Sequence, residues 1–207
     1  SSFSESKSNF IFANSDGFCN GYYSSSFSVF CEALAEENGL MERDYEISVS
    51  RFSKKLDTPQ NIGKVASDRA VSRLGAKKIK SERIPVIFDK RIAKSLLSTI
   101  SSAATGSSFA RNVSFLKDSY KQQIMSNEIN IIDDPLISKA IGSQPFDGEG
   151  VKNKKIYLVK RGILNDLYLD TYNSKILKMN TNGRCGGSTN LYFENGQYDL
   201  KKIISEQ

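Results

Sequence analysis

The sequence predicts an α+β protein in which a long antiparallel hairpin and a helix are followed by a strand–helix unit and a mixed β region. Three observations support this class. Residues 22–52 alternate apolar and polar side chains on both sides of Asn38-Gly39, which is a strong hairpin signal. After Pro59 the apolar spacing becomes helical. From residue 84 onward, short strand-like and short helical segments follow one another.

The hairpin is predicted from period-two patterning. The outgoing strand places alternate apolar residues on one face, and we expect the returning strand, 41–52, to place its own apolar residues on the matching face. Residues 1–9 are polar and are expected to form a loose lead-in to a short strand at 10–13. The two apolar sets are Phe27, Val29, Cys31, Ala33 and Ala35 on the outgoing strand, and Met41, Tyr45, Ile47 and Val49 on the returning one.

A helix is predicted after the hairpin because Asp57-Thr58-Pro59 combines a cap with proline at the first helical position. Gly75 is expected to end it. A domain boundary is expected near Ser81, so that residues 1–80 and 84–207 belong to different domains. The intervening basic cluster favours a solvated junction over a phosphate-binding patch, because no aromatic residues are interleaved with it. That cluster is Lys77, Lys78, Lys80 and Arg83.

The second half alternates short elements. Asp89 is expected to cap a helix whose apolar residues fall between Ile92 and Ile100, while residues 107–125 fit either a helix or an irregular segment. The remaining expectations are a strand at 84–89, a hairpin of 155–161 and 163–170 about Gly162, a helix at 171–179, a loop at 180–188, a strand at 190–193 and, from Asp199, the start of a helix that the chain does not finish.

The segment from Ile131 to Val151 is unusually rich in proline, glycine and acidic residues, which favours a shaped connection rather than a linker. Turn and cap roles are preferred for its acids over acid–base catalysis, since the sequence indicates no cavity that would shift their pKa values. The calcium-loop pattern is absent. Its characteristic residues are Asp133, Asp134, Pro135, Pro145, Phe146, Asp147, Gly148, Glu149 and Gly150.

Composition excludes several kinds of chemistry. The chain has no histidine, which removes Ser-His-Asp and Cys-His catalysis and the common His-based zinc sites. Three cysteines are too few for a disulfide framework, so a cytoplasmic location is expected. No apolar run is long enough for a membrane span, and no membrane partner is expected. The net charge of +6 is distributed rather than concentrated.

Asp133-Asp134-Pro135 followed by Ser143-x-Pro-Phe-Asp-Gly-Glu-Gly-Val151 resembles the PmbA/TldE branch of the TldD/PmbA family, whose members are regarded as subunits of peptide-processing metalloproteases. Arg69-Ala70…Arg73-Leu74-Gly75-Ala76 agrees with it. The resemblance implies a fragment of a larger TldD/PmbA fold, with residues 1–80 in the middle domain and 84–207 in the first part of the C-terminal domain.

The resemblance also implies where zinc chemistry would lie. The catalytic TldD branch carries a His-Glu-x-x-x-His motif, whose histidine and glutamate positions fall here on Leu97, Ser98 and Ser102. None of these side chains can take the metal-binding or base role. The resemblance therefore implies a metal-free subunit with no cofactor of its own. Zinc would be held by a TldD-like partner, and the complex would mature peptides and degrade unfolded ones.

Two alternatives stay open. For the Gly183–Gly187 loop, a glycine-rich turn with an incidental thiol is the preferred interpretation, and a role in peptide or subunit contact is the second hypothesis. The residues concerned are Arg184, Cys185, Gly186 and Gly187. For the whole protein, the rival to a peptidase subunit is a DNA- or gyrase-associated regulator, as an older family label suggests. No helix-turn-helix or basic-aromatic pattern supports nucleic-acid binding. A homodimeric scaffold without a peptidase partner is the third possibility.

Overall fold

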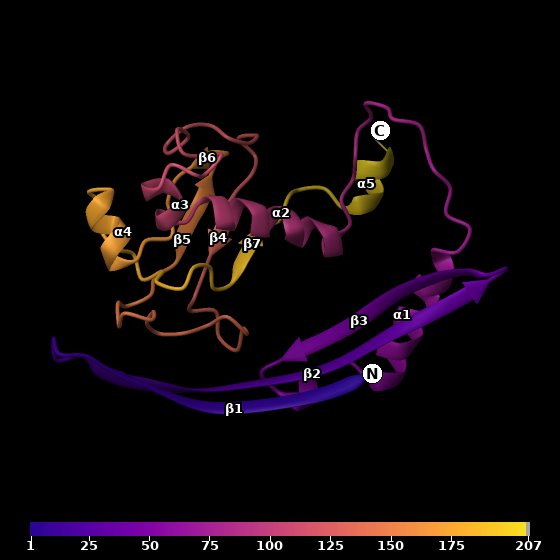
Figure 1. Cartoon of the computed structure of the whole chain (residues 1–207), viewed down its shortest axis with the longest axis horizontal. Helices are drawn as coiled ribbons and strands as arrows, with labels where there is room; N and C mark the ends of the chain where they lie inside the picture. Colours follow the sequence, from indigo (N-terminus) through magenta and orange to yellow (C-terminus); the bar gives the residue numbers. More distant parts are fainter. Residues whose placement is uncertain (206–207) are drawn as a thin grey trace. The chain divides into compact units, whose positions relative to one another are not determined.

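The structure is a computed structural model that describes residues 1–205, and it divides into two compact units. The first unit comprises residues 1–11, 21–83 and 139–141, and the second comprises residues 12–20, 84–138 and the chain from residue 142 onward. Each unit is built around a sheet of its own, and Figure 1 shows the elements coloured along the sequence. The α+β class predicted from the sequence is confirmed.

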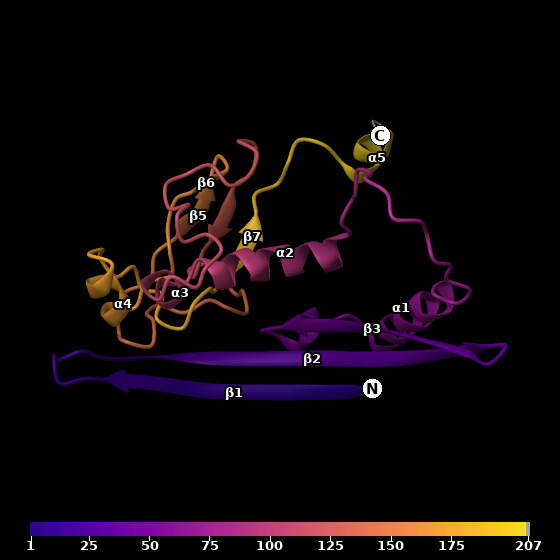
Figure 2. The same ribbon diagram turned by 45° about the horizontal axis from the view of Figure 1, so that its top comes forward.

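The first unit is built on a three-stranded sheet in the order β1-β2-β3, formed by β1 (Ser2–Ala13), β2 (Cys19–Glu37) and β3 (Leu40–Ser50) (Figure 2). The expected loose lead-in at residues 1–9 is wrong, because β1 begins at Ser2. Cross-strand contacts explain its order: the Ser8 and Ser24 hydroxyls lie 2.8 Å apart, and the rings of Phe10 and Tyr22 lie 5.3 Å apart. A neighbouring strand thus orders a sequence whose composition alone suggests a coil.

The predicted hairpin about Asn38-Gly39 is confirmed, but the predicted match of its apolar faces is wrong. Both turn residues have positive φ, 52° and 77°, and Glu37 pairs with Leu40. Every odd-numbered residue of β2 therefore lies opposite an even-numbered residue of β3, as in the pair of Cys31 with Glu46. Since directly paired residues share a face, the apolar residues of β3 lie on the face opposite that of Phe27. They are Met41, Tyr45, Ile47 and Val49.

Helix α1 (Pro59–Ser72) packs against β3 and follows a short 3-10 turn, η1 (Ser53–Lys55). The predicted cap is confirmed, since the Thr58 hydroxyl accepts a hydrogen bond from the Asn61 N–H at 3.3 Å. The helix buries Ile62, Ala66 and Ala70. Arg69 pairs with Glu46, and Arg73 lies 3.3 Å from the Asp44 carboxylate, so the polar side chains of β3 face this helix.

The second unit contains a four-stranded sheet in the order β6-β5-β4-β7, whose strand pairs are antiparallel. The hairpin predicted about Gly162 is present, but its second strand, expected over 163–170, is limited to Ile163–Leu164. The helix expected from Asp199 begins at Leu200, and residues 206–207 lie outside the described part of the chain. The elements are α2 (Lys90–Ala103), α3 (Gly106–Ala110), β4 (Ile131–Asp133), β5 (Ile156–Lys160), β6 (Ile163–Leu164), α4 (Thr171–Ile176), β7 (Leu191–Phe193) and α5 (Leu200–Ser205).

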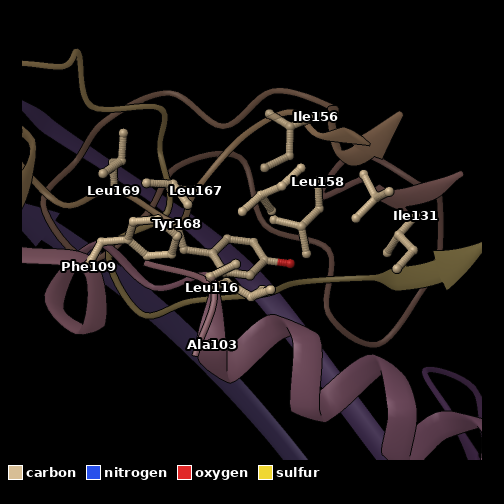
Figure 3. Packing of buried hydrophobic residues seen from close by; sticks show 12 residues of the cluster. Ala103, Phe109, Leu116, Ile131, Ile156, Leu158, Leu167, Tyr168 and Leu169 are labelled. Atoms are coloured by element: carbon tan, nitrogen blue, oxygen red, sulfur yellow. The ribbon is translucent and has the colours of Figure 1, made fainter. Parts of the chain in front are cut away.

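The core of the second unit lies between its sheet and the C-terminal end of α2 (Figure 3). Leu158, on β5, is fully buried, and Ala103 and Ala104 bring the end of α2 close to Tyr168. The backbone also joins these parts, since the Tyr168 N–H donates to the Ala104 carbonyl at 2.9 Å.

The strand predicted at residues 84–89 is wrong. This segment has no regular secondary structure, and Ile84, Val86 and Phe88 are exposed. A strand requires a hydrogen-bonded neighbour, and no strand formed by residues 1–205 pairs with this segment. Its last residue does behave as predicted, because the Asp89 carboxylate caps α2 by accepting from the Arg91 N–H at 2.9 Å.

Candidate functional site

The acidic loop after β4 is organised by the buried carboxylate of Asp147. Its Oδ1 accepts hydrogen bonds from the N–H groups of Glu149 at 3.0 Å and Val151 at 2.9 Å. Its Oδ2 accepts from the Cys185 N–H at 2.9 Å. Asp147 is only 2 % exposed. One side chain therefore closes its own turn and fastens the 180–190 loop to it.

Arg184 is the largest fully buried side chain of the described structure. Its Nη1 donates to the Gly183 carbonyl at 3.0 Å, and its Nη2 donates to the Lys154 carbonyl at 2.7 Å and to the Asp133 carbonyl at 3.2 Å. The Asn153 side-chain oxygen lies 3.5 Å from Nη1. Among the described residues, Nε has no hydrogen-bond partner. The planar guanidinium thus joins several loops from inside.

Asp133 neutralises this buried charge. Its Oδ1 lies 3.7 Å from Arg184 Nη2, and both side chains are 0 % exposed. Its second function is to hold Thr189, whose N–H donates to Oδ2 at 3.0 Å and whose hydroxyl also donates to the carboxylate. A buried ion pair persists only when such additional hydrogen bonds compensate for desolvation. The pair links β4 to the residues that precede β7.

Cys185 and Glu149 lie beside this centre. The Glu149 carboxylate accepts from the Thr171 N–H at 2.8 Å and from its hydroxyl at 2.6 Å, which stabilises the start of α4. Burial raises the pKa of the Cys185 thiol, and the carboxylates of Glu149, Asp147 and Asp170 raise it further. A thiol that resists ionisation is a poor nucleophile, so the environment of Cys185 is the reverse of that around a catalytic cysteine.

The other residues of the acidic loop have turn and packing contacts. The Asp134 carboxylate accepts from the Leu136 N–H at 2.9 Å, and the Pro135 carbonyl accepts from the Gln144 N–H at 3.0 Å. Phe146 packs edge-on against Phe18 with 5.0 Å between ring centroids. At Gly150, φ is 80° and a Cβ atom would lie 2.9 Å from the Phe18 ring, so a larger residue would not fit.

Gly148, Gly186, Gly187 and Pro145 have conformational or backbone roles. Gly186 and Gly187 have φ of 104° and 91°, and a Cβ at either would meet nothing within 4 Å, so only the backbone conformation requires glycine there. Gly148 faces Cys185, since its Cβ would lie 3.6 Å from the sulfur. The Pro145 carbonyl accepts from the Asn153 N–H at 3.0 Å.

Sequence reasoning missed Asn153, Thr189 and Asn182, which complete the network. The Asn182 amide donates to the Leu167 carbonyl at 2.7 Å and accepts from the Leu169 N–H at 3.2 Å. Asn182 and Asn153 are 5 % and 1 % exposed. Short polar side chains in glycine-rich loops usually face solvent, and no local pattern distinguishes the few that are buried.

Leu97, Ser98 and Ser102, the positions onto which the resemblance maps the zinc motif, lie on helix α2. Leu97 packs against the core, and the Ser98 hydroxyl donates to the Lys94 carbonyl at 3.2 Å. Ser98 and Ser102 line an open hollow of about 480 Å³. An aliphatic side chain has no donor atom, and serine hydroxyls are not among the usual zinc ligands, so these residues do not fit the metal. Residues 1–205 contain no group of three or more His, Cys, Asp or Glu side chains that could share an ion.

Comparison with known proteins gives a consistent result along the chain. Residues 1–74 match the model of the PmbA/TldA metallopeptidase central domain, and residues 81–207 match that of the C-terminal domain. The chain is 35 % identical over 196 residues to the metalloprotease PmbA of Escherichia coli O157:H7, covering 95 % of this chain and 44 % of that protein. It is 33 % identical, with the same coverage, to a PmbA homologue of Buchnera aphidicola.

Solved structures agree in fold. A candidate modulator of DNA gyrase from Bacteroides thetaiotaomicron superimposes with a TM-score of 0.90 at 27 % identity, covering 98 % of this chain and 46 % of that one. TldE from Thermococcus kodakarensis shares the fold with a TM-score of 0.78 at 20 % identity. The chain thus spans less than half the length of these relatives. Within residues 1–205, none of the helices has the length and apolar character that a membrane span requires.

Proposed function

Because the chain belongs to the PmbA/TldD family of metallopeptidases, we propose that it is part of a metal-free, TldE-like subunit of a two-subunit peptidase. A TldD-like partner would hold the zinc and hydrolyse the peptide bond. The complex would act in peptide maturation and in the degradation of unfolded peptides, in the cytoplasm. Residues 1–80 would form part of the middle domain of this subunit, and residues 84–207 the first part of its C-terminal domain.

The observation that carries this proposal is the chemistry of α2. The helix that carries the positions matched by resemblance to the zinc motif is regular and is capped at Asp89. The residues at the relevant positions nevertheless lack ligand atoms suited to zinc, and the chain has no histidine at any position. A family member with an intact helix and substituted ligands is best explained as the partner of a catalytic subunit.

The loop network supports a scaffolding role for the second unit. Arg184, Asp133 and Asp147 are committed to internal hydrogen bonds, and the pKa of the Cys185 thiol is raised. Groups occupied in this way position loops and do not perform acid–base or nucleophilic steps. We infer that contact with a peptide or with the partner subunit would come from accessible parts of these loops, such as exposed Gly186 and half-buried Gly187, rather than from the Arg184 side chain.

Regulation of DNA or gyrase is the second candidate. Two features favour it: the net charge of +6, and a basic cluster that is exposed in a segment without regular structure, made up of Lys77, Lys78, Lys80 and Arg83. Phosphate contacts would make DNA affinity fall steeply with salt. A 20-base-pair duplex titrated at low and high salt distinguishes the candidates, since a peptidase subunit needs no such binding.

The decisive experiment is co-purification of the full-length protein with the TldD-like protein of the same organism. Zinc content and cleavage of an unfolded casein substrate are measured on each subunit and on the complex. We expect a stoichiometric complex, with zinc and cleavage absent from this subunit alone. Tight stoichiometric zinc on the isolated subunit, proteolysis by it alone, or the absence of a complex would contradict the proposal.

A further inference from the structure

Four Asn-Gly sequences occur in the chain, and each can undergo the same spontaneous reaction. The backbone nitrogen of the glycine attacks the side-chain Cγ of the asparagine, a C–N bond forms, and the amide nitrogen leaves as ammonia. Water then opens the resulting succinimide ring to aspartate or isoaspartate. Glycine favours the reaction because it has no Cβ to hinder the approach and its backbone rotates freely. The four asparagines are Asn20, Asn38, Asn182 and Asn195.

Asn182 is held by its own side chain. Its amide group donates to the Leu167 carbonyl at 2.7 Å and to the Asp166 carboxylate at 3.0 Å. Its side-chain oxygen accepts from the Leu169 N–H at 3.2 Å, and the residue is 5 % exposed. The following glycine is confined too, since a Cβ atom at Gly183 would lie 2.7 Å from a backbone oxygen. Ring closure would break these hydrogen bonds at a buried position, so the structure protects Asn182.

Asn20-Gly21 is held by strand pairing. Both residues belong to β2, which pairs with β1. A Cβ atom at Gly21 would lie 2.6 Å from the Phe10 carbonyl oxygen, so the neighbouring backbone is very close at this point. For the glycine nitrogen to reach the side chain, its peptide plane must rotate out of the extended conformation. The adjacent strand resists this rotation unless the two strands separate locally.

Asn195-Gly196 lies between β7 and α5, in a segment without regular secondary structure (Figure 1). Both residues are exposed, and a Cβ atom at Gly196 would meet nothing within 4 Å. Within residues 1–205, neither the Asn195 side chain nor the Gly196 N–H forms a hydrogen bond. The attacking nitrogen, the carbon that it attacks and the ring that water must open are therefore all accessible.

Asn38-Gly39 is accessible but conformationally restrained. Both residues are exposed at the turn between β2 and β3, and a Cβ atom at Gly39 would meet nothing within 4 Å. The turn holds them at φ of 52° and 77°, in the left-handed region. Ring closure requires the peptide plane after Asn38 to leave this conformation, which the paired strands on both sides resist. Asn38 should therefore react more slowly than Asn195.

We propose that Asn195 is the principal site of spontaneous deamidation in this protein, that Asn38 follows more slowly, and that the fold protects Asn20 and Asn182. Each event replaces a neutral amide by a carboxylate and so lowers the net charge of the chain, +6, by one. Isoaspartate also adds one atom to the main chain, which at Asn38 alters the loop length that fixes the hairpin register. The reaction needs only water, so the inference does not depend on the proposed function.

The test is peptide mapping by mass spectrometry of the full-length protein after prolonged incubation at mildly alkaline pH. Digestion at acidic pH, where the reaction is slow, preserves the products, and chromatography separates the Asn, Asp and isoAsp forms of each peptide. We expect Asn195 to react fastest and Asn38 next. Asn20 and Asn182 should react at least about tenfold more slowly than Asn195, because the segment around each must open first. In concentrated urea, where this protection is lost, the four rates should converge.

A matched pair of variants tests the assignment of Asn195. Gly196→Ala places a methyl group beside the attacking nitrogen, so it should slow deamidation at Asn195 several-fold and leave the rate at Asn38 unchanged. Gly63→Ala, inside α1, makes the same substitution where no asparagine precedes the glycine, and it should leave the rate at Asn195 unchanged. Neither new Cβ meets an atom within 4 Å, and thermal unfolding checks that both variants are folded.

Three results would overturn the inference: equal rates at the four sites in the native protein, deamidation at Asn182 as fast as at Asn195, or an Asn195 rate that Gly196→Ala does not reduce. A difference between Asn195 and Asn182 that persists in urea would also overturn it, because the neighbouring sequence and not the fold would then set the rates. A rate at Asn38 above that at Asn195 would overturn the ranking of the two accessible sites.

Discussion

Removing the guanidinium of Arg184 is expected to destabilise the second unit strongly. In Arg184→Ala the Asp133 carboxylate remains buried beside carbonyl oxygens that have lost their donor. Breaking a buried ion pair by removing one partner typically costs about 3–5 kcal/mol. Asp133 keeps its hydrogen bonds from Thr189, which places the expected loss of unfolding free energy near the lower end of that range.

The geometry also predicts how variants of Arg184 rank in unfolding free energy. Arg184→Lys keeps the charge but not the planar fork that reaches the Lys154 and Asp133 carbonyls together, so it should recover less than half of the loss. In Arg184→Met, adding Asp133→Asn removes the uncompensated charge and keeps an acceptor for Thr189. The double variant should therefore be about 1–2 kcal/mol more stable than Arg184→Met alone.

Native-state hydrogen exchange of the β5 amides measures this free energy within the second unit, without interference from the first. Lys117→Ala, at an exposed position, is the control and should change stability by less than about 0.5 kcal/mol. A loss below about 1 kcal/mol in Arg184→Ala, or no recovery in the double variant, would refute the view that this ion pair holds the loops together.

Three further outcomes are expected. Burial raises the pKa of Tyr168, and the Asp133 carboxylate raises it further, so the contribution of this residue to stability is complete below about pH 10 and declines above it. In urea titrations at alkaline pH, Tyr168→Phe should therefore lose less unfolding free energy with rising pH than wild type. An equal loss per pH unit in the two proteins would contradict this. In a protein with Cys19 and Cys31 replaced by serine, Cys185 should react with iodoacetamide more slowly at pH 8 than free cysteine does. Glu149→Gln should shift the pH dependence of this reaction rate to lower pH. A rate equal to that of free cysteine would exclude the carboxylate effect. Gly39→Ala should destabilise the protein by about 1 kcal/mol because φ is 77° there, whereas Gly63→Ala inside α1 should stabilise it by about as much. Neither new Cβ would meet an atom within 4 Å, so the difference in thermal unfolding between the two variants reports the effect of backbone conformation alone.

Local chemistry was sufficient for elements whose signals lie within a few residues. The turn at Asn38-Gly39, the caps at Thr58 and Asp89 and the hairpin at Gly162 all follow from residues that directly control φ or satisfy an N–H group. Two segments whose structure depends on a distant neighbour were predicted wrongly. Residues 2–9 belong to a strand because β2 pairs with them, whereas residues 84–89 form no strand because none of the described strands pairs with them.

The sequence by itself determined the family signature, the absence of histidine and the lack of zinc ligands on α2, since these depend only on which side chains are present. Tertiary structure decided what the acidic loop and the glycine loop do. Asp133, Asp147 and Arg184, which a sequence reader would place at the surface, are buried and join the loops from inside. Without water, an unpaired charge is costly, so each of these groups must be paired or hydrogen-bonded within the protein.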